Sequence, residues 1–190
     1  MAVWKRVSLT IAAALSGALV ACGADQGADA SAEAADGPGG LLYAEARLIN
    51  RAREAFGRAI LVDGPNGLVI TIELEGAPAG WHGVHLHDVG SCESADFSSA
   101  GGHFNPEAKA HGLLNVDGPK PANLANIYAH ADGAVRAQLF APGVRLLGAG
   151  GLLDGDGASI IVHENQDDHI TQPIGGSGAR IGCGVIAAAP

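Results

Sequence analysis

In the stretch Leu68-Val69-Ile70-Thr71-Ile72-Glu73-Leu74, large aliphatic residues at every second position alternate with Val69, Thr71 and Glu73. A period of two residues is typical of a β-strand that buries one face. The turn-forming sequence Asp63-Gly64-Pro65-Asn66-Gly67 comes directly before it, and residues 59–62 form another apolar run before that turn. The pattern therefore predicts a β-hairpin.

Similar short apolar runs recur along the rest of the chain, at residues 84–87, 124–129, 134–140, 158–163 and 181–187. Two long segments rich in Gly and Pro, residues 88–123 and 164–182, lie between them. Irregular segments of this length in a compact domain are usually functional. We therefore predict an all-β fold, an antiparallel sandwich or barrel of about eight strands that carries two functional loops.

The composition excludes several classes of protein. The chain has 190 residues, with 11 basic against 20 acidic side chains and a formal net charge of −9, which argues against nucleic acid as a partner. Its 29 glycines argue against a helical bundle, because glycine interrupts helices. Eight histidines and an odd number of cysteines, three, call for an explanation.

The N-terminus has the pattern of an export signal. Lys5 and Arg6 precede an apolar run over residues 7–20, which is short for a membrane span but suits a signal peptide. The run ends in Leu-Val-Ala-Cys, which resembles the bacterial lipoprotein cleavage box. We expect a lipoprotein-type signal peptide at 1–21 and lipidation of Cys22; the alternative is an ordinary signal peptide cut near Ala21, with Cys22 an incidental thiol.

Residues 22–40 are mostly Ala, Gly, Asp and Ser, which predicts a flexible tether before a folded domain at 41–190. The expected location is outside the cytoplasm, in the periplasm or cell envelope, with the lipid on Cys22 as membrane anchor. Lipidation would leave Cys92 and Cys183 as an even pair in an oxidising compartment.

The histidines point to a metal site. His85 and His87 lie two residues apart on a predicted strand, so their side chains share one face, about 7 Å apart at the backbone. A surface strand also carries polar residues at alternate positions, so this pair alone is weak. His103, His111 and His163 each fall at a strand end or in a long loop. A site rich in imidazole suits copper or zinc.

Several motifs resemble those of the copper,zinc superoxide dismutases, in order and with compatible spacing over most of residues 41–187. They are Gly83-Val84-His85-Leu86-His87-Asp88-Val89-Gly90, Ser99-Ala100-Gly101-Gly102-His103-Phe104-Asn105-Pro106, His111-Gly112, Ile161-Val162-His163 with Asp167-Asp168, and Gly178-Ala179-Arg180-Ile181-Gly182-Cys183-Gly184-Val185-Ile186. The resemblance implies a flattened Greek-key β-barrel.

The resemblance also implies a copper site and the residues around it. The copper ligands would be His85, His87, His103 and His163. His103 would bridge to a second metal and carry a proton to superoxide, and Arg180 would attract and hold that anion.

Two further assignments follow from the resemblance. Asp167 would orient a copper histidine and a zinc histidine by accepting hydrogen bonds from both; otherwise it is a solvated loop acid. Cys92 and Cys183 would form the family's intrasubunit disulfide; otherwise they are two buried thiols.

The zinc half departs from the family pattern. His103 and His111 are present, but Lys120 stands at the third histidine position and Asn123 at the aspartate position. A cationic amine and a neutral amide are poor zinc ligands. A complete tetrahedral zinc site is thus not expected unless Asp117, His130 or another group moves in, although the charge of Lys120 could replace that of the ion. We expect copper as cofactor, with zinc doubtful.

The sequence therefore predicts an exported oxidoreductase that converts superoxide to dioxygen and hydrogen peroxide at copper, because zinc has no redox chemistry. A non-catalytic copper-binding protein on the same scaffold is the competing hypothesis, and Arg180 favours the enzyme because a copper store needs no anion-guiding residue. Monomer and homodimer stay open. We interpret His82, His130 and His169 as surface or core residues.

Overall fold

The structure is a computed structural model that describes residues 41–189. The predicted signal peptide, Cys22 and the predicted tether lie outside the described residues. Within the described part, no helix has the length and apolar character needed to cross a membrane.

The regular secondary structure of the described residues is almost entirely β, as predicted. They form nine strands and one short 3-10 helix: β1 (Tyr43–Asn50), β2 (Ala55–Gly64), β3 (Gly67–Leu74), β4 (Gly80–His82), β5 (Val84–His87), η1 (Ser98–Ala100), β6 (Ile127–Ala129), β7 (Val135–Pro142), β8 (Ala158–His163) and β9 (Arg180–Ala188).

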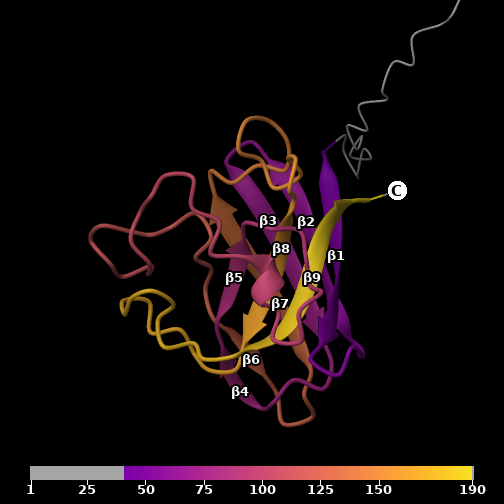
Figure 1. Cartoon of the computed structure of the whole chain (residues 1–190). Helices are drawn as coiled ribbons and strands as arrows, with labels where there is room; N and C mark the ends of the chain where they lie inside the picture. The colour runs from indigo at the N-terminus through magenta and orange to yellow at the C-terminus, as the bar shows by residue number, and fades with distance from the viewer. Residues whose placement is uncertain (1–40, 190) are drawn as a thin grey trace, which may run out of the picture. The chain divides into compact units, whose positions relative to one another are not determined.

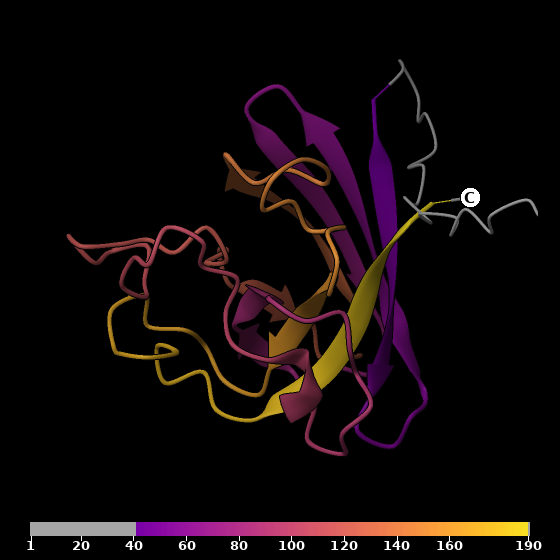
Figure 2. The same ribbon diagram turned by 45° about the horizontal axis from the view of Figure 1, so that its top comes forward.

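The strands make one curled antiparallel sheet in the order β5-β8-β9-β1-β2-β3-β7, with β4 and β6 as a separate pair (Figure 1). The hairpin strands β1, β2 and β3 lie side by side, and β9 returns by a long connection to pair with β1. This arrangement is a Greek key. Figure 2 shows the curl of the sheet from a second direction.

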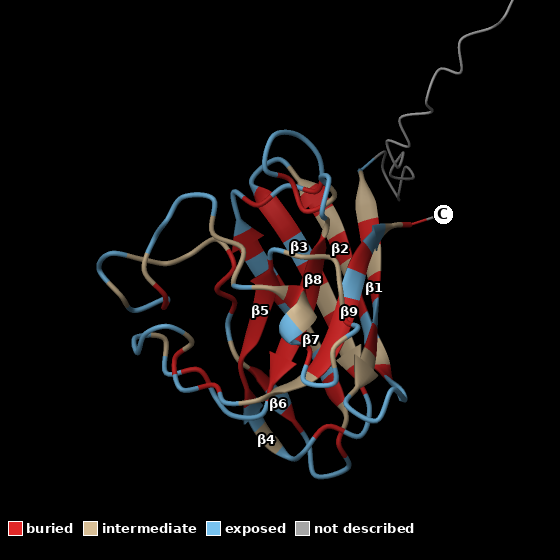
Figure 3. Ribbon diagram, viewed as in Figure 1, coloured by how far each residue is buried: buried red, intermediate tan, exposed pale blue. Residues whose placement is uncertain are grey.

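The core lies on the concave side of the sheet. Leu68, Ile70, Ile72 and Leu74 of β3 are fully buried, as the alternation predicts. The predicted hairpin is also confirmed, with Gly64 opposite Gly67 across a two-residue turn. Figure 3 shows buried residues along the strands, while most of the loop surface is exposed or half-buried.

Three details differ from the sequence prediction. Strand β1 is additional because two of its three buried positions, Ala44 and Ala46, are small and leave Leu48 as its only large buried residue. The short strand β4 is additional as well. Strand β6 begins at Ile127 rather than at residue 124, because Asn123 and Asn126 instead use their side chains to hold the loops.

The two long segments, residues 88–126 and 164–179, lie together on one side of the sheet in both Figure 1 and Figure 2. The Gln172 side chain accepts from the backbone N–H of His111 and donates to its carbonyl, both at 2.9 Å. Asn126 makes the same kind of double contact with the backbone of Asp167. The loops are therefore fastened to each other, beside the buried strand β5.

Candidate metal centre

Four histidine rings converge where β5, β8 and the first long loop meet. His85 and His87 lie on β5, His163 ends β8, and His103 is brought in by a backbone bridge to His87. One ring nitrogen from each lies within 4.8 Å of one from each of the others. The structure thus brings together the four residues that the sequence proposes as copper ligands.

Hydrogen bonds fix the tautomers of three of these rings. His87 and His163 each donate from Nδ1 to a backbone carbonyl, of Gly101 and Gly178, at 3.1 Å. His85 instead donates from Nε2 to Asp167 Oδ2 at 2.7 Å. The opposite nitrogen of each ring therefore carries a lone pair.

These lone-pair nitrogens are buried and have no protein partner in the part of the chain that the structure describes. They are His85 Nδ1, His87 Nε2 and His163 Nε2, together with both ring nitrogens of His103. A buried polar atom without a partner is costly, so a convergent group of them needs a ligand. Neutral imidazole nitrogens in this number fit copper.

The same residues stay neutral at physiological pH. Burial, with the positive charge of Arg180 next in importance, lowers the pKa of His87 to about 2. Burial and the neighbouring His85 lower the pKa of His163 to about 4, and the pKa of His103 is also lowered, chiefly by burial. Because a metal binds the neutral ring, the group needs no deprotonation before binding.

Asp167 links this group to a second one. Its Oδ2 accepts from His85, and its Oδ1 accepts from His111 Nε2 at 3.0 Å and from the backbone N–H of His169 at 2.7 Å. Burial alone would raise the pKa of Asp167, but the hydrogen bonds from His111, His85 and His169 outweigh it and hold the pKa well below its usual range. The carboxylate is therefore ionised and fixed.

The second group, His85, His111 and Asp167, is already satisfied by its own hydrogen bonds. His111 Nδ1 in turn accepts from the Asn123 amide at 2.9 Å. Because both nitrogens of His111 have protein partners, this group does not offer the donors that a tetrahedral zinc ion requires.

Asp117, His130 and Lys120, the residues that could compensate for the two missing zinc ligands, do not complete a zinc site. Neither group of close ligand atoms in the described chain includes Asp117 or His130. Lys120 Nζ lies 3.5 Å from the carbonyl oxygen of Pro173. Its positive charge contributes, after burial and the neighbouring His85 and His87, to the lowered pKa of His103.

Arg180 borders the four-histidine group. Its guanidinium donates to the carbonyls of Phe97, at 2.6 Å, and Gly101, at 2.8 Å. The carbonyl of Gly101 also accepts from His87, so one backbone oxygen positions both side chains. The backbone of Arg180 in β9 also lies opposite that of His163 in β8. These contacts hold a half-buried positive charge beside the histidines.

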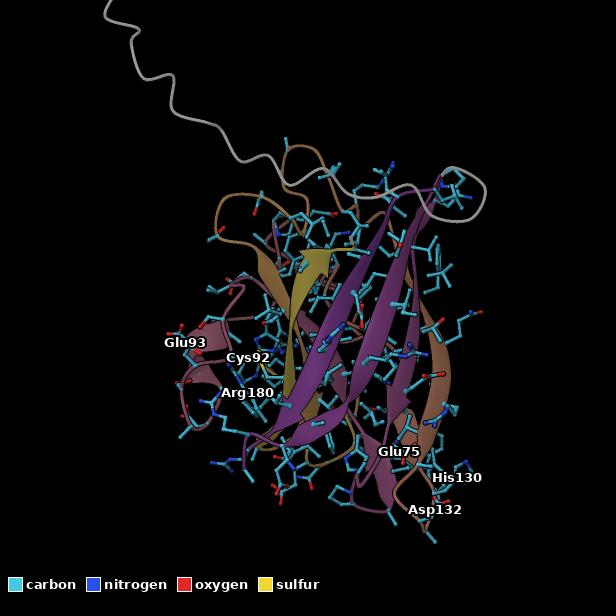
Figure 4. The ribbon with its side chains drawn as sticks, turned by 90° about the vertical axis from the view of Figure 1, so that its right-hand side faces the viewer. Glu75, Cys92, Glu93, His130, Asp132 and Arg180 are labelled. Atoms are coloured by element: carbon cyan, nitrogen blue, oxygen red, sulfur yellow. A yellow bond between two sulfur atoms is a disulfide. The ribbon has the colours of Figure 1, made fainter. Side chains whose placement is uncertain are left out.

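A predicted disulfide braces this side of the molecule. Cys92 is bonded to Cys183, which ties the first long loop to β9, and Figure 4 shows Cys92 and Arg180 on the same side of the sheet. Arg53 donates to the carbonyls of Cys92 and Glu93, and its guanidinium lies 5.7 Å from the centre of the Phe97 ring. The loop that supplies the acceptors of Arg180 is therefore fixed from two directions.

The remaining histidines do not join the four-histidine group. His82 is buried between the carbonyls of His163 and Pro78, His130 is exposed, and His169 contacts the Asn126 amide. Sequence reasoning did not single out Arg53, Asn126, Gln172 or Gly175. The first three hydrogen-bond largely to backbone groups, and such contacts leave no recognisable motif in the sequence. Gly175 matters because it packs against Asp167.

An antiparallel Greek-key fold that brings four imidazoles together beside two long loops, three of them from buried residues, defines an all-β metal-binding protein. The chain belongs to the copper/zinc superoxide dismutase family, because the family model described as "Copper/zinc superoxide dismutase (SODC)" matches residues 56–186. This confirms the resemblance seen in the sequence.

Several relatives are similar over the same region. A Cu-Zn superoxide dismutase of Caulobacter vibrioides is 51% identical over 134 residues, covering 68% of this chain and 77% of the relative. Cu-Zn superoxide dismutase 2 of Aquifex aeolicus is 39% identical over 148 residues, covering 76% and 86%. The crystal structure of a SOD-like protein from Bacillus subtilis superimposes with a TM-score of 0.71 at 40% identity, covering 74% of this chain and 95% of that one.

Proposed function

We propose that the protein is a superoxide dismutase that works with copper alone, in the reaction 2 O2•− + 2 H+ → O2 + H2O2. The observation that carries this proposal is the set of buried ring nitrogens on His85, His87, His103 and His163 that have no partner in the described part of the chain, with Arg180 held beside them. When bound at these nitrogens, copper supplies one-electron redox chemistry.

Arg180 would attract and hold the anionic substrate. The whole chain carries a net charge of −9, which repels anions on average. Local charge governs capture in a site, and the guanidinium of Arg180 is fixed by two carbonyls next to His87. A copper store has no use for such an arrangement, so Arg180 favours the enzyme over the binding protein.

His103 would supply a proton to the product. It differs from the other three rings because neither of its nitrogens has a hydrogen-bond partner within the described chain. One nitrogen can serve the metal group, and the other is free to take up and release a proton. The other three rings each have one nitrogen committed to an acceptor, so they hold position instead.

Loading the purified metal-free protein with copper alone, with metal content and superoxide removal measured together, tests this function. We expect substantial activity in the copper-loaded, zinc-free protein. Full copper occupancy with no activity would establish the non-catalytic copper-binding protein, and no stoichiometric copper binding would refute the site itself. A His130→Ala variant is the matched control, because that histidine is exposed and outside the group.

We also propose that the protein is exported and anchored in the cell envelope through a lipid on Cys22. The Leu-Val-Ala-Cys sequence after an apolar run supports this, and the Cys92–Cys183 disulfide supports an oxidising compartment. Membrane fractionation of cells that express the wild type and a Cys22→Ser variant tests it. We expect wild-type protein in the membrane fraction; equal distribution of the two proteins would contradict the anchor.

A further inference from the structure

The group around His111 continues into a hydrogen-bond chain that runs through Asn123 and ends at backbone N–H groups. Asn123 Oδ1 accepts from the N–H of Gly112 at 2.8 Å and of Lys120 at 3.2 Å. Because both partners are donors, this atom must be the amide oxygen. Asn123 is 3% exposed, so its amide has no alternative partner in water.

This orientation determines which nitrogen of His111 carries the hydrogen. The Asn123 Nδ2 can only donate, so His111 Nδ1 accepts and carries no hydrogen. The hydrogen of His111 is then on Nε2, where it is donated to Asp167 Oδ1. Asp167 accepts at Oδ2 from His85 Nε2, which leaves the lone pair of His85 on Nδ1, in the four-histidine group.

We infer that Asn123 is a positioning residue that orients His85 for copper through His111 and Asp167, in the place where a second metal would otherwise hold His111. This inference rests on the proposed copper site. The structural basis is that a fixed neutral amide donor saturates the ring nitrogen that such a metal would need, and that both long loops are joined through the same chain of contacts.

The Asn123→Asp variant tests this role with little change in shape. An aspartate can still accept from Gly112 and Lys120, but it has no donor for His111 Nδ1. We expect His111 to carry a hydrogen on Nδ1, facing the new carboxylate, which the nitrogen chemical shifts of the ring report, and copper affinity to fall about 10-fold to 100-fold in zinc-free buffer. Asn66→Asp, in the exposed turn between β2 and β3, carries the same change of charge and should alter neither.

Copper affinity in both variants is measured by competition with a chelator, and His111 is observed by NMR in the metal-free protein. An Asn123→Asp variant that keeps the wild-type His111 shifts and copper affinity would overturn the inference. So would zinc that shifts the His111 Nδ1 signal of the wild type and displaces the amide. If the wild type itself fails to bind copper, the proposed function fails. That result differs from a failure of the Asn123 inference, in which the wild type binds copper and the variant binds it equally well.

Discussion

The four-histidine group and the group around His111 are neighbours that share His85 as a member, yet they differ in what their atoms offer. In the first, each ring leaves at least one buried nitrogen without a partner among residues 41–189. In the second, the ring nitrogens of His111 and both oxygens of Asp167 are occupied by hydrogen bonds. The comparison teaches that proximity of ligating residues does not make a metal site; the partner of each ring nitrogen decides whether a lone pair is available.

Removing one imidazole from the four-histidine group should cause the largest loss of copper affinity. In the His163→Ala variant, we expect copper affinity to fall more than about 100-fold, since losing a ligand exceeds the usual cost of losing a residue that only orients one. Superoxide removal should fall with it. Equilibrium competition for copper checks this, with His130→Ala as control; retained affinity in His163→Ala would remove His163 from the site.

Displacing Asp167, which links the two groups through His85 and His111, should cause a smaller loss of copper affinity. A Cβ at Gly175 would run into Asp167 Oδ1, and the residue has φ of 61°, so Gly175→Ala should weaken copper binding about 10-fold to 100-fold and cost about 1–3 kcal/mol of stability. Gly176→Ala is a matched control, because Gly176 has φ of 66° and no described residue beyond its chain neighbours lies within 4 Å of its added Cβ. Both variants should lose stability, but only Gly175→Ala should lose copper affinity. Equal copper affinities would show that the position of Asp167 does not matter.

Arg180→Ala should separate substrate capture from metal binding. We expect unchanged copper content, a rate of superoxide removal lower by about 10-fold, and a weaker dependence of that rate on ionic strength. The exposed Arg51 provides the control, since Arg51→Ala makes the same change in net charge away from the site. Unchanged rate and salt dependence in Arg180→Ala would mean that steering lies elsewhere.

The pH dependence of the metal-free protein sharpens the comparison further. In the folded state the pKa of His163 is about 4 against 6.5 for the free side chain, so between these values the unfolded chain binds more protons. This contribution to stability is therefore complete above about pH 6.5 and is lost as the pH falls towards about 4, by up to about 1.4 kcal/mol per pH unit. Because the lowered pKa values of His87 and His103 add to the slope in both proteins, thermal unfolding at a series of pH values should show a steeper slope in the wild type than in a His163→Ala variant. A His163→Ala variant with the full wild-type slope would refute the contribution of His163.

The sequence predicts the fold class because alternation survives in β3, whose buried positions are large and aliphatic. It fails at β1, where Ala44 and Ala46 fill the same kind of position without a strong signal. The four histidines were found because they fall in motifs with distinctive spacing.

What no pattern of residue types reveals is which atom of each side chain faces which partner. Asn123 reads in the sequence as a lost zinc ligand, and only its contacts with Gly112 and His111 show that it is a donor in a hydrogen-bond chain. Asn126 and Gln172 escape detection for a related reason, because they bind backbone groups of residues far away in the sequence.

The metal content of the protein after exposure to equal excess copper and zinc, followed by removal of loosely bound metal, tests the central claim most directly. The contrast between the four-histidine group and the group around His111 predicts one tightly held copper ion per chain and no stoichiometric zinc, with superoxide removal intact. One tightly held zinc ion alongside the copper, with His111 Nδ1 as a ligand, would contradict it.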